Sequence, residues 1–244
     1  MRWNADHRPW PPPSAPWQMA MTWHDLLFMH WPVSAQALQS RLPAELNVDT
    51  YEGRAWIAVV PFHMSGVRVR WLPPLPGLSA FPELNVRTYV RVGDRPGVYF
   101  FTLDAANAIA VATARRFYRL NYVRARMRVE CRDDWIHYES RRTRRGAGPA
   151  ELVVRYRPAG PVYSARPGDL DRWLTERYCL YTFDGRGRIF AAEIHHAPWR
   201  LHVAQADIGR NTMTQALGIE LPDMPPLLHY AQRLDVVAWP LRRV

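Results

Sequence analysis

Lysine is absent from this sequence of 244 residues, and all 32 of its basic side chains are arginines. This absence excludes every mechanism that needs a lysine amine. Among these are a Schiff base with a carbonyl substrate, an anchor for pyridoxal phosphate and the phosphate-binding lysine of a Walker motif. Any reaction catalysed by this chain must therefore proceed without a covalent lysine intermediate.

Several other signatures are missing as well. No serine stands in a G-x-S-x-G elbow, and no G-x-G-x-x-G or other glycine-rich phosphate loop occurs, which argues against an ordinary serine hydrolase and against nucleotide cofactors. The sequence contains no run of roughly 18 apolar residues, the length that a helix needs to span a membrane. The N-terminus also lacks the apolar segment of a secretory signal. We therefore expect a cytoplasmic protein with no cofactor and no membrane partner.

Cysteine is scarce. Cys131 and Cys179 lie far apart and match no metal-binding spacing. Both stand in apolar surroundings, which predicts that they are small buried residues rather than a disulfide or a catalytic thiol.

The positive charge is large but not concentrated. A formal net charge of +10 would suit a nucleic-acid partner, yet the arginines are spread along the whole chain. Exclusion of lysine indicates a compositional bias towards arginine more than selection for phosphate contacts. The one dense run, Arg141 to Gly148, is typical of a solvated loop tip. We expect no nucleic-acid partner.

Residues 1–20 are rich in proline and tryptophan, with WPPPSAPW at Trp10 to Trp17. Such a segment favours polyproline II and forms no core of its own. We expect an arm that lies either against its own domain or against a neighbouring subunit, which leaves a homo-oligomer open. Residues 21–244 are expected to form a single domain.

The remaining chain alternates between strand and short helix patterns. Ser34 can cap a helix that ends before Pro43. Glu83 to Val92 alternates with period two, and a turn at 93–97 leads into a partner strand, which predicts a hairpin. Asp104 is expected to cap a helix that runs to Tyr118. Further strands are expected at 53–64, 122–131, 135–141, 151–156 and 233–239, and further helices at 170–180 and 213–217. This order predicts a mainly β (α+β) fold, a barrel or cone with a few inserted helices.

Two of these strands carry charged side chains on one face. Glu83, Asn85 and Arg87 share one side of the first, and Tyr122 and Arg126 share one side of the second. An antiparallel sheet with one face in water explains the pattern simply. Alternatively, both faces line a polar interior, where a buried carboxylate needs cationic partners and arginine can bind a substrate carboxylate.

A metal site is a third candidate. His195 and His196 follow Glu193, and on a strand Glu193 and His195 share a face. A complete site would need more ligands, taken from His30, His63, His202 or His229. Structural histidines explain the pair more simply, and we expect no metal.

Longer blocks of the sequence resemble a known family. HWPV, GRAWIAVVPFHMSGVR, FPELNVRTYV, PGVYFFTLDA, ARRFYRLNY, RARM, LTERYCLY, HHAPW and LDVVAWPL, in this order from about Trp23 to Val244, resemble the YqjF-like family of uncharacterised conserved proteins. That family looks related to the acetoacetate decarboxylase-like superfamily, built on a β-barrel or cone of mostly antiparallel strands around a polar cavity. The resemblance implies a fold but not a reaction.

The segment ARRFYRLNYV is similar to the decarboxylases' catalytic stretch, which reads roughly G-R-E-x-W-G-F-P-K-K. In that comparison Arg115 keeps the arginine, Arg116 replaces the glutamate and Asn121 replaces the proline. Tyr122 falls on the Schiff-base lysine and Val123 on its neighbour. Since both amines are missing, the covalent decarboxylase mechanism does not carry over.

What the resemblance implies is a polar cavity without its lysine. Glu83 and Tyr122 are its candidate catalytic residues, Glu83 as an acid or base and Tyr122 as a hydrogen-bond donor or a filler of the lysine's volume. The candidate ligand-binding residues are Arg87, Arg115, Arg116 and Arg126. The leading hypothesis is a protein that binds a small anionic organic molecule in this cavity, with or without non-covalent catalysis. The alternative is a non-catalytic interaction protein that assembles through its Trp/Pro-rich arm.

Overall fold

The computed structural model of the chain describes residues 4–107, 119–143, 148–184 and 186–244. Within these residues thirteen strands form one sheet. The strands are β1 (Met19–Val33), β2 (Asn47–Val48), β3 (Ala55–Val69), β4 (Phe81–Val92), β5 (Arg95–Ala105), β6 (Tyr122–Arg132), β7 (Trp135–Arg142), β8 (Glu151–Tyr163), β9 (Cys179–Phe183), β10 (Ile189–His195), β11 (Leu201–Asn211), β12 (Leu227–Ala238) and β13 (Arg242–Arg243). Helices α1 (Ala35–Gln39) and α3 (Leu170–Thr175) and a 3₁₀ turn, η1 (Gln215–Leu217), interrupt them. The mainly β fold with few helices is as predicted.

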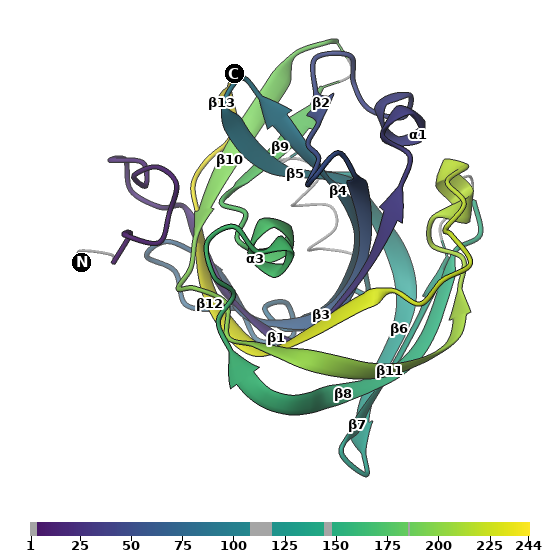
Figure 1. Cartoon of the computed structure of the whole chain (residues 1–244). Helices are drawn as coiled ribbons and strands as arrows, with labels where there is room; N and C mark the ends of the chain where they lie inside the picture. Colours follow the sequence, from purple (N-terminus) through teal and green to yellow (C-terminus); the bar gives the residue numbers. More distant parts are fainter. Residues whose placement is uncertain (1–3, 108–118, 144–147, 185) are drawn as a thin grey trace.

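Seven of the strands close into a ring. The pairings run β1–β3–β4–β5–β9–β10–β12 and return from β12 to β1. All are antiparallel except β5–β9, which is parallel. Figure 1 views this ring along its axis, with α3 in its opening. We call these seven strands the ring.

The parallel β5–β9 contact depends on a glycine. A Cβ added to Gly97 would lie 2.7 Å from the carbonyl oxygen of Cys179 and 2.7 Å from Cε2 of Tyr181. Real Cβ atoms do not approach so closely, so only glycine lets the backbone of β9 come within pairing distance at this point.

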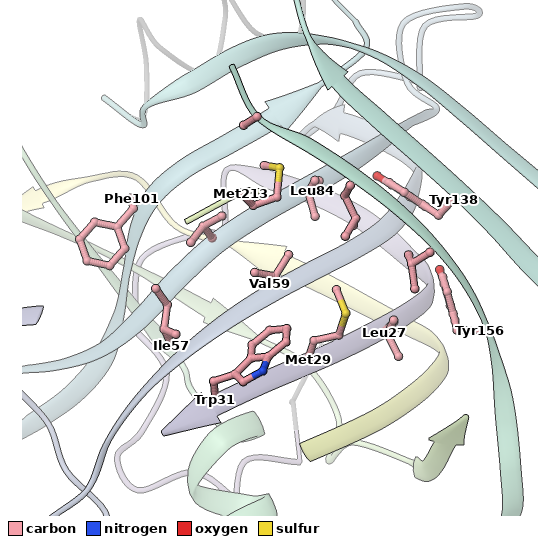
Figure 2. Packing of buried hydrophobic residues seen from close by; sticks show 14 of the residues in the cluster. Leu27, Met29, Trp31, Ile57, Val59, Leu84, Phe101, Tyr138, Tyr156 and Met213 are labelled. Atoms are coloured by element: carbon pink, nitrogen blue, oxygen red, sulfur yellow. The ribbon is translucent and has the colours of Figure 1, made fainter. Parts of the chain in front are cut away.

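Four further strands, β6, β7, β8 and β11, form a wing that leaves the ring at β5 and returns to it at β12. The wing folds over the outer face of β1, β3 and β4, and the largest apolar core lies between the two (Figure 2). Leu27 and Met29 of β1 and Ile57 and Val59 of β3 pack there with Tyr156 of β8. One face of the ring strands is thus used for the core, which leaves the opposite face for the interior of the ring.

Several predictions about single helices and strands are confirmed. Ser34 caps α1, its hydroxyl oxygen accepting from the amide of Ala37 at 3.3 Å. The hairpin at Glu83 to Asp104 forms as β4 and β5. The helix expected at 170–180 ends at Thr175 because Cys179 already pairs in β9.

Two predictions on single residues were wrong. Asp104 caps no helix, because it lies in β5 and is paired with Leu84; the rest of that expected helix, from 108 to 118, lies outside the described residues. Cys131 is exposed near the end of β6, whereas Cys179 is buried as expected. The structure also adds strands that were not foreseen, above all β1 and β11.

The N-terminal arm contacts its own chain. The Arg8 guanidinium is buried and bonds Glu193 at 3.1 Å, and the Trp10 indole donates to the same carboxylate at 2.8 Å. His7 contacts the carbonyl of His196 at 2.8 Å. The polar side chains of His7, Arg8 and Trp10 therefore bond to groups of the same chain. Assembly through the arm stays a prediction, as does the division into an arm and one domain. No helix in the described part of the chain is both long and apolar enough to cross a membrane.

Candidate functional site

A row of polar side chains lines the inner face of β4. Glu83, Asn85, Arg87 and Tyr89 alternate along the strand, and their exposed fractions are 3%, 4%, 8% and 0%. We call these four residues the polar row. The first interpretation of this pattern, a face open to water, is therefore wrong for β4, because both faces of this strand are buried. It holds for β6, where Arg124 and Arg126 are exposed. Tyr89 donates to the carbonyl of Leu174 in α3 at 2.8 Å, which places the row inside the ring that α3 enters.

Glu83 and Tyr122 meet at one end of the row. The Tyr122 hydroxyl donates to Oε2 of Glu83 at 2.7 Å, and both residues are buried. Burial raises the pKa of Glu83 from its ordinary value of 4.5 to about 8, the Tyr122 hydrogen bond opposes that shift, and the charge of Asp104 adds to it. The carboxyl group is therefore mostly protonated at neutral pH, and its proton can be donated.

A buried ion pair supports this end of the row from the other side of the sheet. Nε of Arg142 donates to one oxygen of Asp104 at 2.8 Å, and Nη2 donates to the other at 2.9 Å. Nη2 also donates to the Thr102 hydroxyl at 2.7 Å. The two charged side chains are only 2% and 0% exposed. The expectation that the arginine run from Arg141 is solvated therefore fails at Arg142.

Arg87 lies in the middle of the row and lacks an ionic partner. No carboxylate of the described residues pairs with it, and the remaining stretches contain no Asp or Glu. Its Nε and Nη2 atoms are buried without a hydrogen-bond partner among the described residues. The guanidinium carbon lies 5.3 Å from the centre of the Phe28 ring and 5.9 Å from that of Tyr89. Aromatic faces favour a cation, but they do not satisfy N–H donors.

Two histidines complete the end of the interior near α3. His30 of β1 and His229 of β12 are 0% and 2% exposed. His30 bonds the Tyr89 hydroxyl through Nε2 at 2.7 Å, and Nε2 of His229 lies 2.9 Å from Oδ1 of Asp171 in α3. Each leaves Nδ1 without a hydrogen-bond partner in the described structure. The interior therefore combines a carboxylic acid, a guanidinium whose Nε and Nη2 atoms have no hydrogen-bond partner, and two imidazoles.

The other predicted site residues do not join this group. Arg126 is exposed on β6, because that strand pairs with the ring only over Tyr122–Arg124 and then continues into the wing. Its assignment to the cavity wall is wrong. Arg115 and Arg116 lie outside the described residues, so their assignment stays a prediction.

The histidine pair at 195–196 lies where β10 meets the N-terminal arm, whose His7 contacts the carbonyl of His196 at 2.8 Å. Glu193 bonds Arg8, Trp10 and Arg95, and Nδ1 of His196 contacts the carbonyl of Ala197 at 2.7 Å. In the part of the chain that the structure describes, no three His, Cys, Asp or Glu side chains are grouped as a metal site would require.

Sequence reasoning missed Tyr89 and Asp171 as members of the site and the Asp104–Arg142 pair behind it. It considered His30 and His229 only as extra metal ligands. Tyr89 was within reach, since it shares the alternating face with Glu83 and Arg87. The others carry no local signal. Asp171 belongs to the site only because α3 enters the ring next to β12.

Comparison of the sequence with known proteins identifies a family and a relative. The model of the family DUF2071, described as an uncharacterized conserved protein, matches residues 20–235. The uncharacterized protein YqjF of Bacillus subtilis (strain 168) is 47% identical over 231 residues, which cover 95% of this chain and 94% of that protein.

Solved structures share the fold at low identity. An acetoacetate decarboxylase-like enzyme from Sphingomonas wittichii RW1 superposes with a TM-score of 0.63 at 12% identity, covering 98% of this chain and 97% of that one. Acetoacetate decarboxylase from Legionella pneumophila gives 0.63 at 11%, covering 99% and 94%. The enduracididine biosynthesis enzyme MppR, complexed with pyruvate, gives 0.64 at 11%, covering 98% and 93%. The acetoacetate decarboxylase-like fold expected from the sequence is thus confirmed.

Proposed function

This chain belongs to the DUF2071 family of uncharacterized conserved proteins, and we propose that it binds a small carboxylate-bearing molecule inside the ring. The carboxylate lies against Arg87, and Glu83 faces the other end of the molecule as a neutral acid. The observation that carries the proposal is the buried guanidinium of Arg87, which has no carboxylate partner in its own chain.

An unpaired buried cation is costly. Removing a guanidinium from water costs several kcal/mol unless a counter-charge and hydrogen bonds compensate for it. The other deeply buried arginines follow this rule, since Arg8, Arg142 and Arg177 each bond a carboxylate. Arg87 breaks it, and its Nε and Nη2 donors have the spacing that a carboxylate accepts in a bidentate contact. An anionic ligand would supply what the chain lacks.

Glu83 gives the same interior a proton donor. With its pKa raised to about 8, its carboxyl group can donate a proton or a hydrogen bond to an oxygen of the ligand at neutral pH. Tyr122 orients that group by donating to Oε2. Catalysis at this site would be non-covalent acid catalysis, because the chain has no lysine.

The neighbours in fold support a small acid as the ligand class. MppR, at 11% identity, was solved with pyruvate bound, and the Legionella neighbour is an acetoacetate decarboxylase. Both names refer to small keto acids. The common fold alone does not carry their chemistry to this chain, and the proposal depends on Arg87.

The test is calorimetric titration with butyrate, using the neutral butyramide as the matched probe. Butyrate should bind and butyramide should not. Arg87→Met should weaken butyrate binding by about 10- to 100-fold, the usual loss for a hydrogen bond to a charged group. The variant should stay folded, because it removes a buried charge that has no partner.

Arg126→Met is the matched control, since it removes an exposed arginine and should leave binding unchanged. The proposal is wrong if butyrate does not bind the parent protein, or if Arg87→Met binds it as tightly as the parent does.

A further inference from the structure

The two histidines near α3 present hydrogen-bond acceptors to the interior. The proton of the Tyr89 hydroxyl is used in the bond to the Leu174 carbonyl, at 2.8 Å. Tyr89 must therefore accept from Nε2 of His30, 2.7 Å away, so Nε2 carries the ring proton. Burial lowers the pKa of His30 well below its usual range, so the ring is neutral. A neutral ring protonated on Nε2 has a lone pair on Nδ1.

His229 has the same arrangement. Its Nε2 lies 2.9 Å from Oδ1 of Asp171, whose other oxygen accepts from the Tyr163 hydroxyl at 2.8 Å. A carboxylate only accepts, so Nε2 of His229 carries a proton. Its Nδ1 atom is buried without an acceptor among the described residues, which favours a lone pair there as well. The two rings are 5.8 Å apart.

These acceptors lie next to the Arg87 guanidinium. In the sheet register His30 is opposite Ala58, and Ala58 is opposite Arg87. Only a methyl group therefore stands between the imidazole and the guanidinium in this cross-strand row. His229 is opposite Phe28 in the next row, and Phe28 contacts both Arg87 and His30. Free N–H donors and free nitrogen lone pairs thus face one part of the interior.

We propose that the ligand is a hydroxycarboxylic acid, whose carboxylate binds Nε and Nη2 of Arg87 and whose hydroxyl group donates to Nδ1 of His229. This inference rests on the proposed function of Arg87 and adds the chemistry of the neighbouring substituent. A hydroxyl group supplies the donor that Nδ1 of His229 lacks. A keto oxygen only accepts, and it would face lone pairs at the same position.

The experiment compares acids of equal length. Butyrate, 2-oxobutyrate and the separate enantiomers of 2-hydroxybutyrate and 3-hydroxybutyrate are titrated into the full chain. At least one hydroxy acid should bind about tenfold or more tightly than butyrate, since it satisfies a buried acceptor. The oxo acid should bind no better than butyrate.

Asp171→Asn provides the decisive variant. Tyr163 donates to one oxygen of Asp171, so the asparagine oxygen should take that position and its amide should donate to Nε2 of His229. The proton of His229 then moves to Nδ1, which becomes a donor. Asp171→Asn should lose the preference for the hydroxy acid and gain affinity for the oxo acid, while butyrate binding, which depends on Arg87, stays unchanged and reports an intact fold.

The outcomes separate the two proposals. If no carboxylate binds the parent protein, the proposed function fails, and this inference fails with it. If butyrate binds but the hydroxy acids bind no more tightly, or the oxo acid binds more tightly than they do, only the inference fails. Unchanged selectivity in Asp171→Asn would equally overturn the role given to His229.

Discussion

Arg142→Met should lower the free energy of unfolding by about 3 to 5 kcal/mol, the range found when one partner of a buried ion pair is removed. Arg142 and Asp104 are 2% and 0% exposed, and the guanidinium bonds both carboxylate oxygens and the Thr102 hydroxyl. Without the arginine, Asp104 must either keep a charge that no cation compensates or take up a proton. Urea unfolding at neutral pH measures the loss.

Two further variants show whether the pair itself is responsible. Arg233→Met removes a surface ion pair whose side chains are 62% and 69% exposed, and it should cost no more than about 1 kcal/mol. The double variant Asp104→Leu with Arg142→Met removes both buried charges and should recover much of the loss. A single variant Arg142→Met that is as stable as Arg233→Met would contradict the prediction.

The second large effect is a pH dependence that comes from Glu83. Burial raises its pKa from 4.5 to about 8, so the folded protein keeps a proton that the unfolded chain releases. Below pH 4.5 the group is protonated in both states and costs nothing. As the pH rises from 4.5 to 8, stability is lost, and above pH 8 the accumulated loss is on the order of 4 to 5 kcal/mol.

Glu83→Gln should remove this dependence, because the amide does not ionise. The difference in unfolding free energy between the variant and the parent protein should grow in favour of the variant from pH 5 to pH 9. Tyr122→Phe is the companion variant. It removes the hydrogen bond that lowers the pKa of Glu83, so the loss of stability should extend to higher pH. Equal slopes for the parent and Glu83→Gln would show that Glu83 is not buried as described.

The sequence was most informative where neighbouring residues decide the structure. Period-two alternation predicted β4, the turn residues predicted its hairpin with β5, and Ser34 predicted the start of α1. Alternation also grouped Glu83 with Arg87. It did not show whether that face is exposed to solvent or buried. A polar lining inside a ring and a polar outer surface give the same alternation of polar and apolar residues.

The failures share a physical cause, which is contact between distant segments. Asp104 has the local pattern of a helix cap, but Arg142, 38 residues later, holds it in a strand. Tyr122 and Arg126 share a face of β6, yet the strand leaves the ring between them, so only Tyr122 reaches Glu83. The partners of His30 and His229 likewise come from β4 and α3. Contacts between residues this far apart leave no local pattern in a single sequence.

The pairing of β1 with β12 also has a consequence for biosynthesis. Met19 is opposite Ala238, and His30 is opposite Leu227, so the ring is closed by the first and last long strands of the chain. During translation β1 is made before β12, and it has no partner on this side until β12 has been made. Its exposed edge is then open to pairing with other chains. Because His30 and His229 come from these two strands, a chain that stops before β12 lacks both His229 and the strand that closes the ring, so it cannot form this interior.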